Sequence, residues 1–339
     1  MSFRVRPVRN EDFPAVYEMA KLTGGGFTNL PPDRGALVAK ISHSADAFAR
    51  EEESPEGDLF MFVLENMDTG QIRGTCQIFS RVGLQQPFYS YRISTLTQTS
   101  RELGRTFKAE TLTLCTDFEG CSEVGGLFLH PGERAGGHGL LLARSRYLFI
   151  KLHRQRFADK VIAELRGVID EAGGSPFWDA IAGRFFGMSF QEADEFNAAH
   201  GTQFIADLMP KTPIYTAMLP ESARCVLGVP HPSGRAAMKM LEREGFSADG
   251  YVDIFDGGPT MAVATDRIRT IRESRQFTLA GNGTGEEGQK VMLAAGRLGG
   301  FSACYGKVLP ARDKTATLDE QSIRLLGIGR ADAFLAIGR

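Results

Sequence analysis

The sequence has few of the residues that build disulfide frameworks or metal sites. Its 339 residues include five cysteines, an odd number with no C-x-x-C pair, so we expect neither a disulfide framework nor a thiolate zinc site. The six histidines show no metal-ligand spacing, and we expect no bound metal and no other resident cofactor. Unpaired thiols are typical of a reducing compartment, and this favours the cytoplasm.

Charge of one sign is not in excess, because 39 basic and 41 acidic residues leave a net charge of −2. Nucleic-acid and membrane-surface binding need a clustered basic excess, so we expect neither partner. No apolar run reaches the roughly 18 residues of a membrane span, and residues 1–10 carry arginines but no apolar stretch of a signal peptide. The composition, with 42% hydrophobic and 24% charged residues, is that of an ordinary soluble globular protein.

The most informative segment is 126–146, which reads GLFLHPGERAGGHGLLLARSR. A short apolar run at 127–129 is followed by Arg134, Gly137 and Gly139 in the spacing R-x-x-G-x-G, and apolar residues then resume. This pattern predicts a strand, a glycine-rich turn and the first turn of a helix. Glycines let a ligand approach the backbone, and the free N–H groups of a helix start bind anions, so a pyrophosphate fits there. The alternative is a plain strand-to-helix turn.

That spacing resembles the acyl-CoA-binding loop of the GNAT superfamily of N-acyltransferases, in which the loop holds the pyrophosphate of coenzyme A. Apolar periodicity predicts strands at 3–8, 59–64, 72–79, 111–115 and 123–129, and helices from residue 13, at 33–50 and at 140–154. This order of elements is that of an acyltransferase core. We therefore predict an α/β (α+β) fold with a GNAT-like mixed sheet, in which residues 1–155 form the acyl-CoA-binding half.

A second copy of this design is predicted downstream. A strand at 160–165, a helix at 175–186, a helix at 234–244 with Gly245 as its cap and a strand at 251–255 indicate an acyltransferase-like half at 156–275. The two halves would then be arranged in tandem. After residue 275, short apolar pieces at 290–293, 301–308, 315–318, 323–326 and 333–337 predict a small β-rich C-terminal domain, residues 276–339.

Four longer strings resemble one particular family, the arginine N-succinyltransferases. They are KLTGGGFTNLP (21–31), AELRGVIDEAGGSPFWDAIAGRFF (163–186), LMPKTPIYTAMLP (208–220) and YVDIFDGGPT (251–260). The resemblance runs from about residue 3 to residue 275 and is faint in the tail. It implies transfer of the succinyl group of succinyl-CoA to the α-amino group of L-arginine, the first step of a bacterial route of arginine catabolism.

The resemblance also bears on partners. Succinyl-CoA and L-arginine are implied as substrates, succinyl-CoA being a co-substrate and not a resident cofactor. Some members of the family also accept ornithine, and some are paired alpha and beta subunits. A homo-oligomer or a heteromer with a homologous subunit is therefore expected. Two alternatives stay open: an acyltransferase of this fold with another acyl donor or amine, and a non-catalytic partner subunit.

The resemblance implies an acyl-CoA-binding strand and loop. Succinyl-CoA binding carries over to the first leucine of the L-F-L triplet, and the triplet and loop together give the predicted set Leu127, Phe128, Leu129, Arg134, Gly137 and Gly139. In related acyltransferases a splay or bulge in this strand frees a backbone N–H for the thioester carbonyl. One such donor is typically worth about 3 kcal/mol in the transition state.

The resemblance places the catalytic histidine in an H-P pair ahead of a helix that ends E-G-F. In this sequence the pair is His231-Pro232, with Glu244-Gly245-Phe246 downstream. Imidazole titrates near neutrality, so His231 can take a proton from the amine or return one to the CoA thiolate. Tyr215 is a second candidate for protonating the thiolate, with a packed tyrosine as the alternative.

The substrates also require complementary charge, because a guanidinium favours a carboxylate and a carboxylate favours an arginine. Candidates for binding the guanidinium of arginine are Asp170 with Glu171, or Asp253 with Asp256. Candidates for binding the succinyl carboxylate are Arg92 or Arg166. Each of them has a structural alternative as a cap or surface ion pair. Four further features are interpreted more plainly: residues 24–26 as a helix stop or substrate-side loop, His130 and His138 as bystanders, and Trp178 as a core residue.

Overall fold

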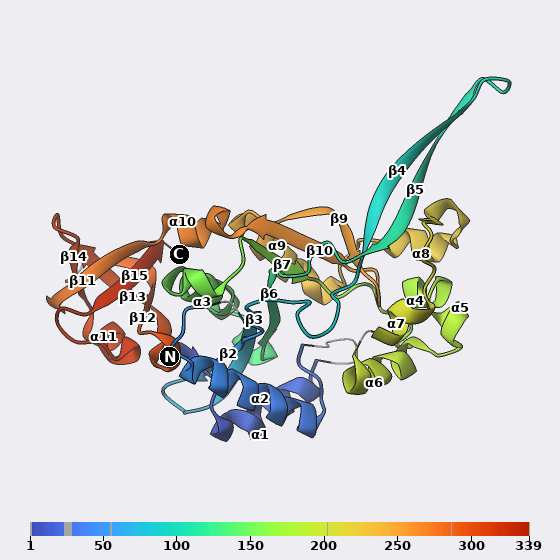
Figure 1. The fold of residues 1–339 in the computed structure, drawn as a ribbon. Coiled ribbons are helices and arrows are strands. Elements are labelled where there is room, and N and C mark those ends of the chain that lie inside the picture. Colours follow the sequence, from blue (N-terminus) through green and yellow to red (C-terminus); the bar gives the residue numbers. More distant parts are fainter. Residues whose placement is uncertain (1, 24–28, 55, 202, 286, 339) are drawn as a thin grey trace.

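The computed structural model describes residues 2–23, 29–54, 56–201, 203–285 and 287–338 (Figure 1). Its strands are β1 (Phe3–Pro7), β2 (Leu59–Asn66), β3 (Ile72–Phe79), β4 (Ser90–Ser100), β5 (Arg105–Cys115), β6 (Ser122–Leu129), β7 (Lys160–Glu164), β8 (Ile214–Tyr215), β9 (Ser247–Asp253), β10 (Pro259–Ala264), β11 (Arg275–Asn282), β12 (Gln289–Ala295), β13 (Ser302–Pro310), β14 (Thr315–Leu318) and β15 (Ala333–Gly338). Its helices are α1 (Phe13–Lys21), α2 (Arg34–Ala49), α3 (His138–Leu152), α4 (Pro176–Ala180), α5 (Gly183–Phe186), α6 (Phe190–His200), α7 (Gln203–Leu208), α8 (Glu221–Val226), α9 (Arg235–Glu244), α10 (Arg269–Glu273) and α11 (Glu320–Leu326).

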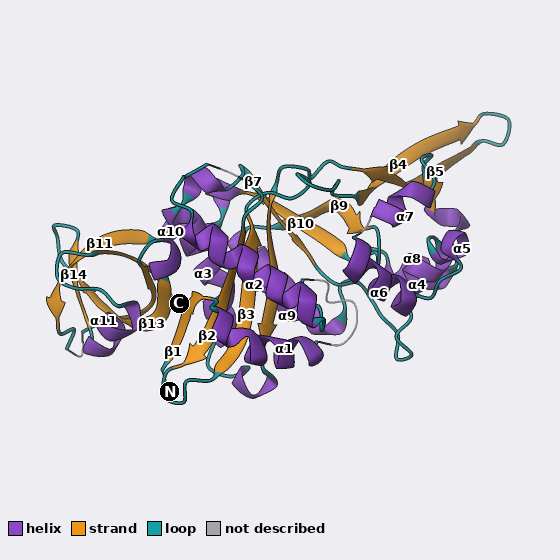
Figure 2. Ribbon diagram, turned by 60° about the horizontal axis from the view of Figure 1, so that its bottom comes forward, coloured by secondary structure: helices purple, strands orange, loops and turns teal. Residues whose placement is uncertain are grey.

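These strands join into one mixed sheet in the order β12-β15-β11-β14-β13-β1-β2-β3-β6-β7-β10-β9-β4-β5-β8. Helices cover both faces of its centre. Strand β2 sends Phe60 and Phe62 to one side, where they meet α3, and Met61 and Val63 to the other, where they meet α1 and α2. Figure 1 shows α3 above the central strands and α1 and α2 below them, and Figure 2 brings α2 in front. The predicted α/β fold with a mixed sheet is confirmed.

Helix α3 is the centre of the molecule, because every residue from Leu141 to Ile150 is buried. A helix that is buried all round needs partners for its polar side chains. Arg144 pairs with Glu244 at 3.2 Å, and Arg146 donates to the carbonyls of Ala143 and Gly125. The helix begins two residues before the predicted position and ends two residues before the predicted end.

Strands β4 and β5 form a long hairpin that projects from the body of the protein (Figure 1). The sequence predicted only a short strand at 111–115, although β5 begins at Arg105. The outer part of the hairpin is rich in threonine and poor in apolar residues, so it has no alternation of apolar and polar positions to reveal it. At its base, Tyr91 and Leu112 are buried in a second core formed with α4 to α8, β8 and β9. Trp178 lies in this core and is fully buried, as predicted.

The C-terminal strands close into a small ring, since β12 pairs with β13 as well as with β15. The predicted strand at 323–326 was wrong, because these residues belong to α11. Asp319 caps that helix by accepting a hydrogen bond from the Ser322 N–H, and this N-cap pattern outweighs the apolar run. The ring is joined to the main sheet by the pairing of β13 with β1.

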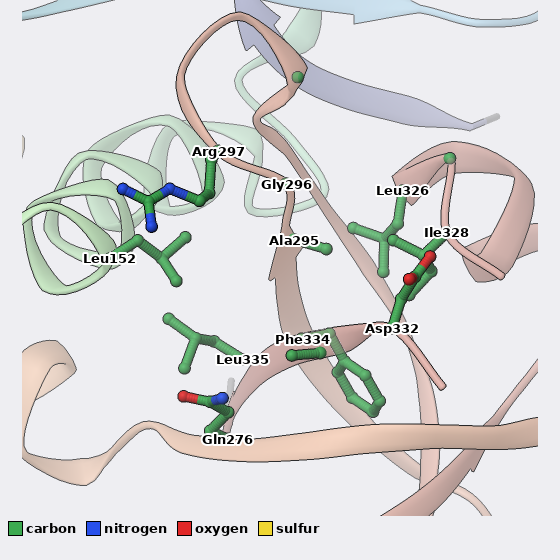
Figure 3. Close-up of a pocket in the computed structure, with 13 residues that line it drawn as sticks. Leu152, Gln276, Ala295, Gly296, Arg297, Leu326, Ile328, Asp332, Phe334 and Leu335 are labelled. Carbon is green, nitrogen blue, oxygen red and sulfur yellow. The ribbon is translucent and has the colours of Figure 1, made fainter. Parts of the chain in front are cut away.

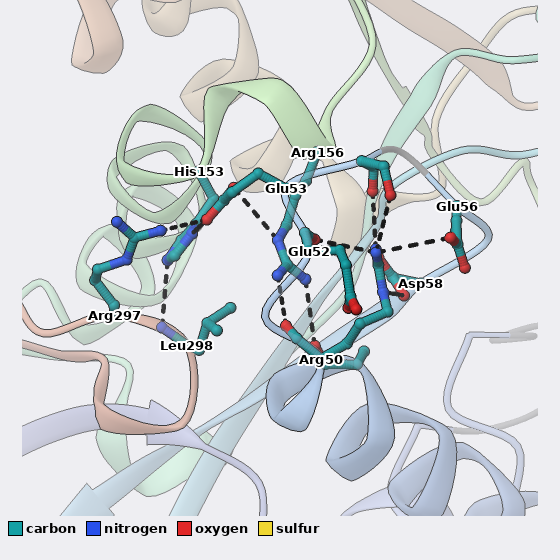
Figure 4. Close-up of polar contacts among 11 residues, drawn as sticks. Arg50, Glu52, Glu53, Glu56, Asp58, His153, Arg156, Arg297 and Leu298 are labelled. Atoms are coloured by element: carbon teal, nitrogen blue, oxygen red, sulfur yellow. Dashed lines mark hydrogen bonds and ion pairs between the residues drawn. The ribbon is translucent and has the colours of Figure 1, made fainter.

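A partly buried polar network also ties the segment between β12 and β13 to the end of α3 (Figure 4). Glu53 pairs with His153 at 3.0 Å and with Arg156 at 3.4 Å, and it also binds Arg297. His153 is 1% exposed, and its Nε2 accepts a hydrogen bond from the Leu298 N–H. Burial lowers the pKa of His153 more than Glu53 raises it, so the ring is neutral and donates from Nδ1 to Glu53.

The division of the chain into two acyltransferase-like halves, 1–155 and 156–275, and a C-terminal domain, 276–339, stays a prediction. Residues 156–275 add β7, β10 and β9 to the sheet begun by the first segment and also build the helical core around Trp178. The glycine run 24–26 lies outside the described residues. None of the described helices is long and apolar enough to cross a membrane.

Candidate active site

The L-F-L triplet lies where β6 leaves its parallel neighbour. Strands β6 and β7 are paired only at Ser122 with Val161 and Glu123 with Ile162. Beyond Glu123 they diverge, so the backbone of Leu127–Leu129 has no ladder partner on the β7 side among the described residues. Groups of this kind are the free donors that a thioester carbonyl requires.

The same strand carries a bulge. Opposite it on β3, Thr75 pairs with Phe128 and Gln77 with Gly125, so that one extra residue is inserted in β6. Gly126 takes this place with a φ of 57°, and a side chain there would meet Gln77 at 2.7 Å. The bulge therefore depends on a residue without a Cβ, and it redirects the backbone just before Leu127.

The glycine loop leads from β6 into the start of α3. His130 begins a single 3-10 turn, Pro131–Glu133, and Arg134 follows it on the surface. Gly137 is the N-cap of α3 with a φ of 83°, and its carbonyl accepts a hydrogen bond from the Tyr305 hydroxyl at 2.9 Å. A left-handed N-cap with an exposed arginine beside it can bind an anionic group. The predicted strand, turn and helix are all present.

His231 lies at the carboxyl end of β7. Its N–H donates to the Arg166 carbonyl at 2.7 Å, and Arg166 is two residues beyond the last residue of β7. Because β6 and β7 run parallel, their carboxyl ends lie at the same edge of the sheet. His231 and the Leu127–Leu129 segment are therefore both placed at the end where the two strands diverge.

The imidazole of His231 is half-buried and oriented by the turn that follows it. Its Nδ1 accepts a hydrogen bond from the Ser233 N–H at 3.3 Å and lies 2.7 Å from the Ser233 Oγ, so both groups of Ser233 fix the orientation of the ring. Burial and, second, the positive charge of Arg166 hold the pKa of His231 below its ordinary value of 6.5. The neutral ring can act as a base at neutral pH.

The two H-P pairs of the chain have the same local structure. His130 accepts a hydrogen bond from the Gly132 N–H, and His231 accepts one from the Ser233 N–H, each ahead of a helix. They differ in their neighbours, because the Nδ1 of His130 is 2.7 Å from an Arg73 guanidinium nitrogen. His130 is therefore bound within the loop. His138, the other predicted bystander, packs its ring against that of Phe3, with the ring centroids 4.0 Å apart and the planes tilted by 41°.

The other residues proposed to bind the charged groups of the substrates differ in whether their side chains already have partners in the fold. Asp170 accepts hydrogen bonds from the Ala172 and Gly174 N–H groups and closes a surface turn. Arg92 forms an exposed ion pair with Asp117 at the base of the hairpin. Arg166 is partly buried beside His231, and its Nε has no partner among the described residues.

Sequence reasoning missed two carboxylates on the two strands that diverge at this edge, Glu123 and Glu164. Glu123 lies on β6 and Glu164 ends β7. Burial raises the pKa of each, and for Glu164 the carboxylates of Asp253, Glu123 and Asp256 raise it further. The signal was present in the sequence as single acidic residues inside otherwise apolar strands, a pattern that is unusual for a buried strand.

A cavity of about 450 Å³ lies far from these residues, between α3 and the C-terminal strands (Figure 3). Its walls include Leu152, Phe334 and Leu335, with Arg297 at its edge. It has none of the predicted site residues. Among the residues that the structure describes, no group of three or more His, Cys, Asp and Glu side chains is arranged to hold a metal ion.

A bulged strand that diverges from its parallel neighbour and leads through a glycine loop into a buried helix is the arrangement predicted for a GNAT-like acyltransferase fold. The chain belongs to the arginine N-succinyltransferase family, since the family model described as "Arginine N-succinyltransferase beta subunit" matches residues 3–270.

Individual relatives agree with this family. The chain is 42% identical over 314 residues to the "Arginine N-succinyltransferase subunit beta" of Pseudomonas aeruginosa, covering 93% of this chain and 91% of that protein. It is 46% identical over 272 residues to the arginine N-succinyltransferase of Citrobacter koseri, covering 80% and 78%. Among solved structures, arginine/ornithine succinyltransferase subunit AI of Pseudomonas aeruginosa matches with a TM-score of 0.91 and 32% identity, covering 99% of this chain and 98% of that one.

Proposed function

We propose that the protein transfers the succinyl group of succinyl-CoA to the α-amino group of L-arginine. The observation that carries the proposal is the shared edge at which β6 leaves β7. There the backbone of Leu127–Leu129 has no ladder partner on the β7 side among the described residues, and His231 is held against the end of β7. Family membership supports the choice of substrates. We place the reaction in the cytoplasm, in keeping with the cysteine pattern.

In the proposed complex the pyrophosphate of CoA lies on the glycine loop. Gly137 and Gly139 allow its approach, and the first N–H groups of α3 together with Arg134 supply positive charge. The thioester then lies along the diverging part of β6, where a free backbone N–H donates to its carbonyl oxygen. Since the backbone supplies this bond, the geometry of Leu127 matters more than its side chain.

His231 takes the proton that the α-ammonium group of arginine must lose. The neutral amine nitrogen attacks the thioester carbon, a C–N bond forms, and the C–S bond breaks to release CoA thiolate. The attached nitrogen still carries one proton more than the amide product, and this second proton passes to the thiolate while the first leaves His231 for solvent. Positioning the two substrates can supply roughly 7 kcal/mol or more of the barrier reduction in well-oriented systems.

Arg166 is the better placed of the two arginines proposed for the succinyl carboxylate. It follows β7 beside His231, and its Nε is unpartnered among the described residues, whereas Arg92 is already paired with Asp117. An arginine side chain with a free Nε can bind a carboxylate in the two-point geometry that this pair favours. Arg166 would thereby distinguish succinyl-CoA from acetyl-CoA.

The active assembly is proposed to contain more than one chain, either copies of this one or a homologous subunit. The word "subunit" in the names of two relatives supports this. The experiment that tests the function is release of CoA thiol from succinyl-CoA by the purified protein. The amines are L-arginine, L-ornithine or none, and acetyl-CoA is the donor control. Arginine-dependent release with succinyl-CoA supports the proposal, and no release with either amine contradicts a stand-alone enzyme.

A further inference from the structure

A row of polar side chains crosses one face of the central sheet beside the proposed reaction centre. Gln77 on β3 pairs with Gly125, which is two residues from Glu123 on β6. Glu123 pairs with Ile162, which is two residues from Glu164 on β7, and Glu164 pairs with Thr260 on β10. Paired residues share a face, and so do residues two apart on one strand. The side chains of Gln77, Glu123, Glu164 and Thr260 therefore lie on one face, across four adjacent strands.

Most of the carboxylates around this row already have partners in the fold. Asp256 accepts hydrogen bonds from the Gly167 and Gly258 N–H groups at 2.7 and 2.8 Å. Asp253 accepts from the Phe255 and Asp256 N–H groups, and Glu123 accepts from the Asn29 amide at 3.1 Å. Asp253 and Asp256 were candidates for binding the guanidinium, and these bonds give them a structural role instead.

Three buried polar atoms in the row have no hydrogen-bond partner among the described residues, and one of them is the Thr260 hydroxyl. The Oε1 of Glu164 accepts no hydrogen bond from any described residue, and neither does the Oε1 of Gln77. Gln77 is 0% exposed, and its Nε2 donates to the Asn29 carbonyl at 2.9 Å, which places its amide beside the Asn29–Glu123 pair. Unsatisfied buried acceptors are rare and costly, so this arrangement points to a ligand that donates hydrogen bonds.

The charge of the surroundings favours a cation. Glu123, Glu164, Asp253 and Asp256 act on one another electrostatically, and the cations among them are Lys40 beside Glu123 and Arg166 beside Asp256. A planar guanidinium has five N–H donors and a fixed positive charge, so it can satisfy a carboxylate and an amide oxygen together. The described acidic residues are not arranged as a metal site.

The row is also connected to His231. Glu164 lies two residues before Arg166, whose carbonyl accepts the His231 N–H at 2.7 Å. We propose that this row is the subsite for the side chain of the amine substrate, in which Glu164 pairs with the guanidinium of arginine and Gln77 accepts a further hydrogen bond from it. The inference rests on the proposed function and names the residues that would select arginine.

The test compares arginine with citrulline, which has the same shape but a neutral ureido group. In Glu164→Gln we expect the KM for arginine to rise at least tenfold and kcat to change less than about threefold, because one charge-assisted pair is lost. The preference for arginine over citrulline should fall at least tenfold, while the KM for succinyl-CoA stays unchanged. Glu242→Gln, an exposed carboxylate on α9, is the matched control and should change none of these values.

The outcomes separate this inference from the proposed function. If the wild-type protein turns over arginine and Glu164→Gln keeps the full preference over citrulline, the subsite is wrong and the function stands. If the wild-type protein has no activity with arginine, the function is wrong. Calorimetry of arginine and citrulline binding to the whole chain loaded with CoA then tests the subsite, which requires arginine to bind and citrulline to bind at least tenfold more weakly. If Glu164→Gln does not fold, Glu164→Asp and Gln77→Leu carry the same test, and an unchanged preference in both overturns the inference.

Discussion

His231 combines a base with a nearby positive charge that keeps it unprotonated. Burial lowers its pKa first and Arg166 lowers it second, and the Ser233 hydroxyl 2.7 Å from Nδ1 orients the ring. The consequence is a base that is already neutral when the amine arrives. Arg166 is also the residue proposed to bind the succinyl carboxylate. Binding of succinyl-CoA would therefore be coupled to the protonation of His231.

The pH dependence of kcat/KM for arginine tests this arrangement. A lowered pKa means that the neutral form is present above it, so activity is lost as pH falls through a value below 6.5. Arg166→Gln removes one of the two causes and should move this acidic limb to higher pH. Arg243→Gln, an exposed arginine on α9, should leave the limb in place. An unmoved limb in Arg166→Gln would mean that another group sets it.

Gly126 has a different importance, since its lack of a side chain sets the path of β6. Gly126→Ala places a Cβ at a φ of 57° and 2.7 Å from Gln77. Gly70→Ala is the matched control, because Gly70 has a φ of 72° and nothing within 4 Å of an added Cβ. We expect about 1 kcal/mol of destabilisation for Gly70→Ala from its backbone alone.

For Gly126→Ala we expect about 1 to 3 kcal/mol more than for the control, together with a loss of kcat as the bulge shifts. Urea unfolding of both variants and steady-state rates provide the measurement. Equal destabilisation of the two variants would show that the contact with Gln77 is relieved without moving the strand.

At the scale of elements, α3 is held by a buried ion pair that links four separate segments. The Arg144 Nε lies 3.2 Å from the Glu244 Oε1 at the end of α9, and Arg144 also donates to the Gly338 carbonyl at the end of β15. Thr270 at the start of α10 donates to both Glu244 oxygens. The pair therefore fixes the helix that carries the glycine loop relative to the helix that follows His231.

Breaking this pair should destabilise the whole protein. Glu244→Gln leaves the Arg144 charge buried without its counter-ion, and the expected loss is about 3 kcal/mol of unfolding free energy. Glu273→Gln removes an exposed partner of Arg269 and should leave the unfolding midpoint unchanged. Thermal or urea unfolding distinguishes the two. A Glu244→Gln protein as stable as the wild type would show that the buried pair contributes nothing beyond its packing.

The elements that carry the site were predictable because their signals are local. The strand at 72–79 has the predicted bounds, and the glycine loop has its left-handed residue at Gly137. The outer part of the β4–β5 hairpin was missed because it lacks an alternation of apolar and polar residues. Helix α11 was predicted as a strand because its helical structure depends on a single capping residue. Glu164 could not be assigned to the site, because the other residues of its row, such as Gln77 and Thr260, come from strands far away in the chain.

At the scale of the whole molecule, the sheet brings distant segments to one edge. Glycine-loop residues near position 137 and His231 are separated by nearly a hundred positions, and the short parallel pairing of β6 and β7 places them at the same end. The C-terminal segment contributes to the core around α3 through Met292 and Leu335 on its strands and Phe301 just before β13. The tail therefore supports the helix on which the proposed CoA site is built.

Thiol release from succinyl-CoA by the wild-type protein and His231→Ala, with and without L-arginine, tests the central claim most directly. We predict release that requires both substrates and falls at least about a hundredfold in His231→Ala, with the variant as well folded as the wild type. Release by His231→Ala at the wild-type rate would contradict the role of His231. A wild-type protein that releases no thiol with arginine would contradict the proposed reaction itself.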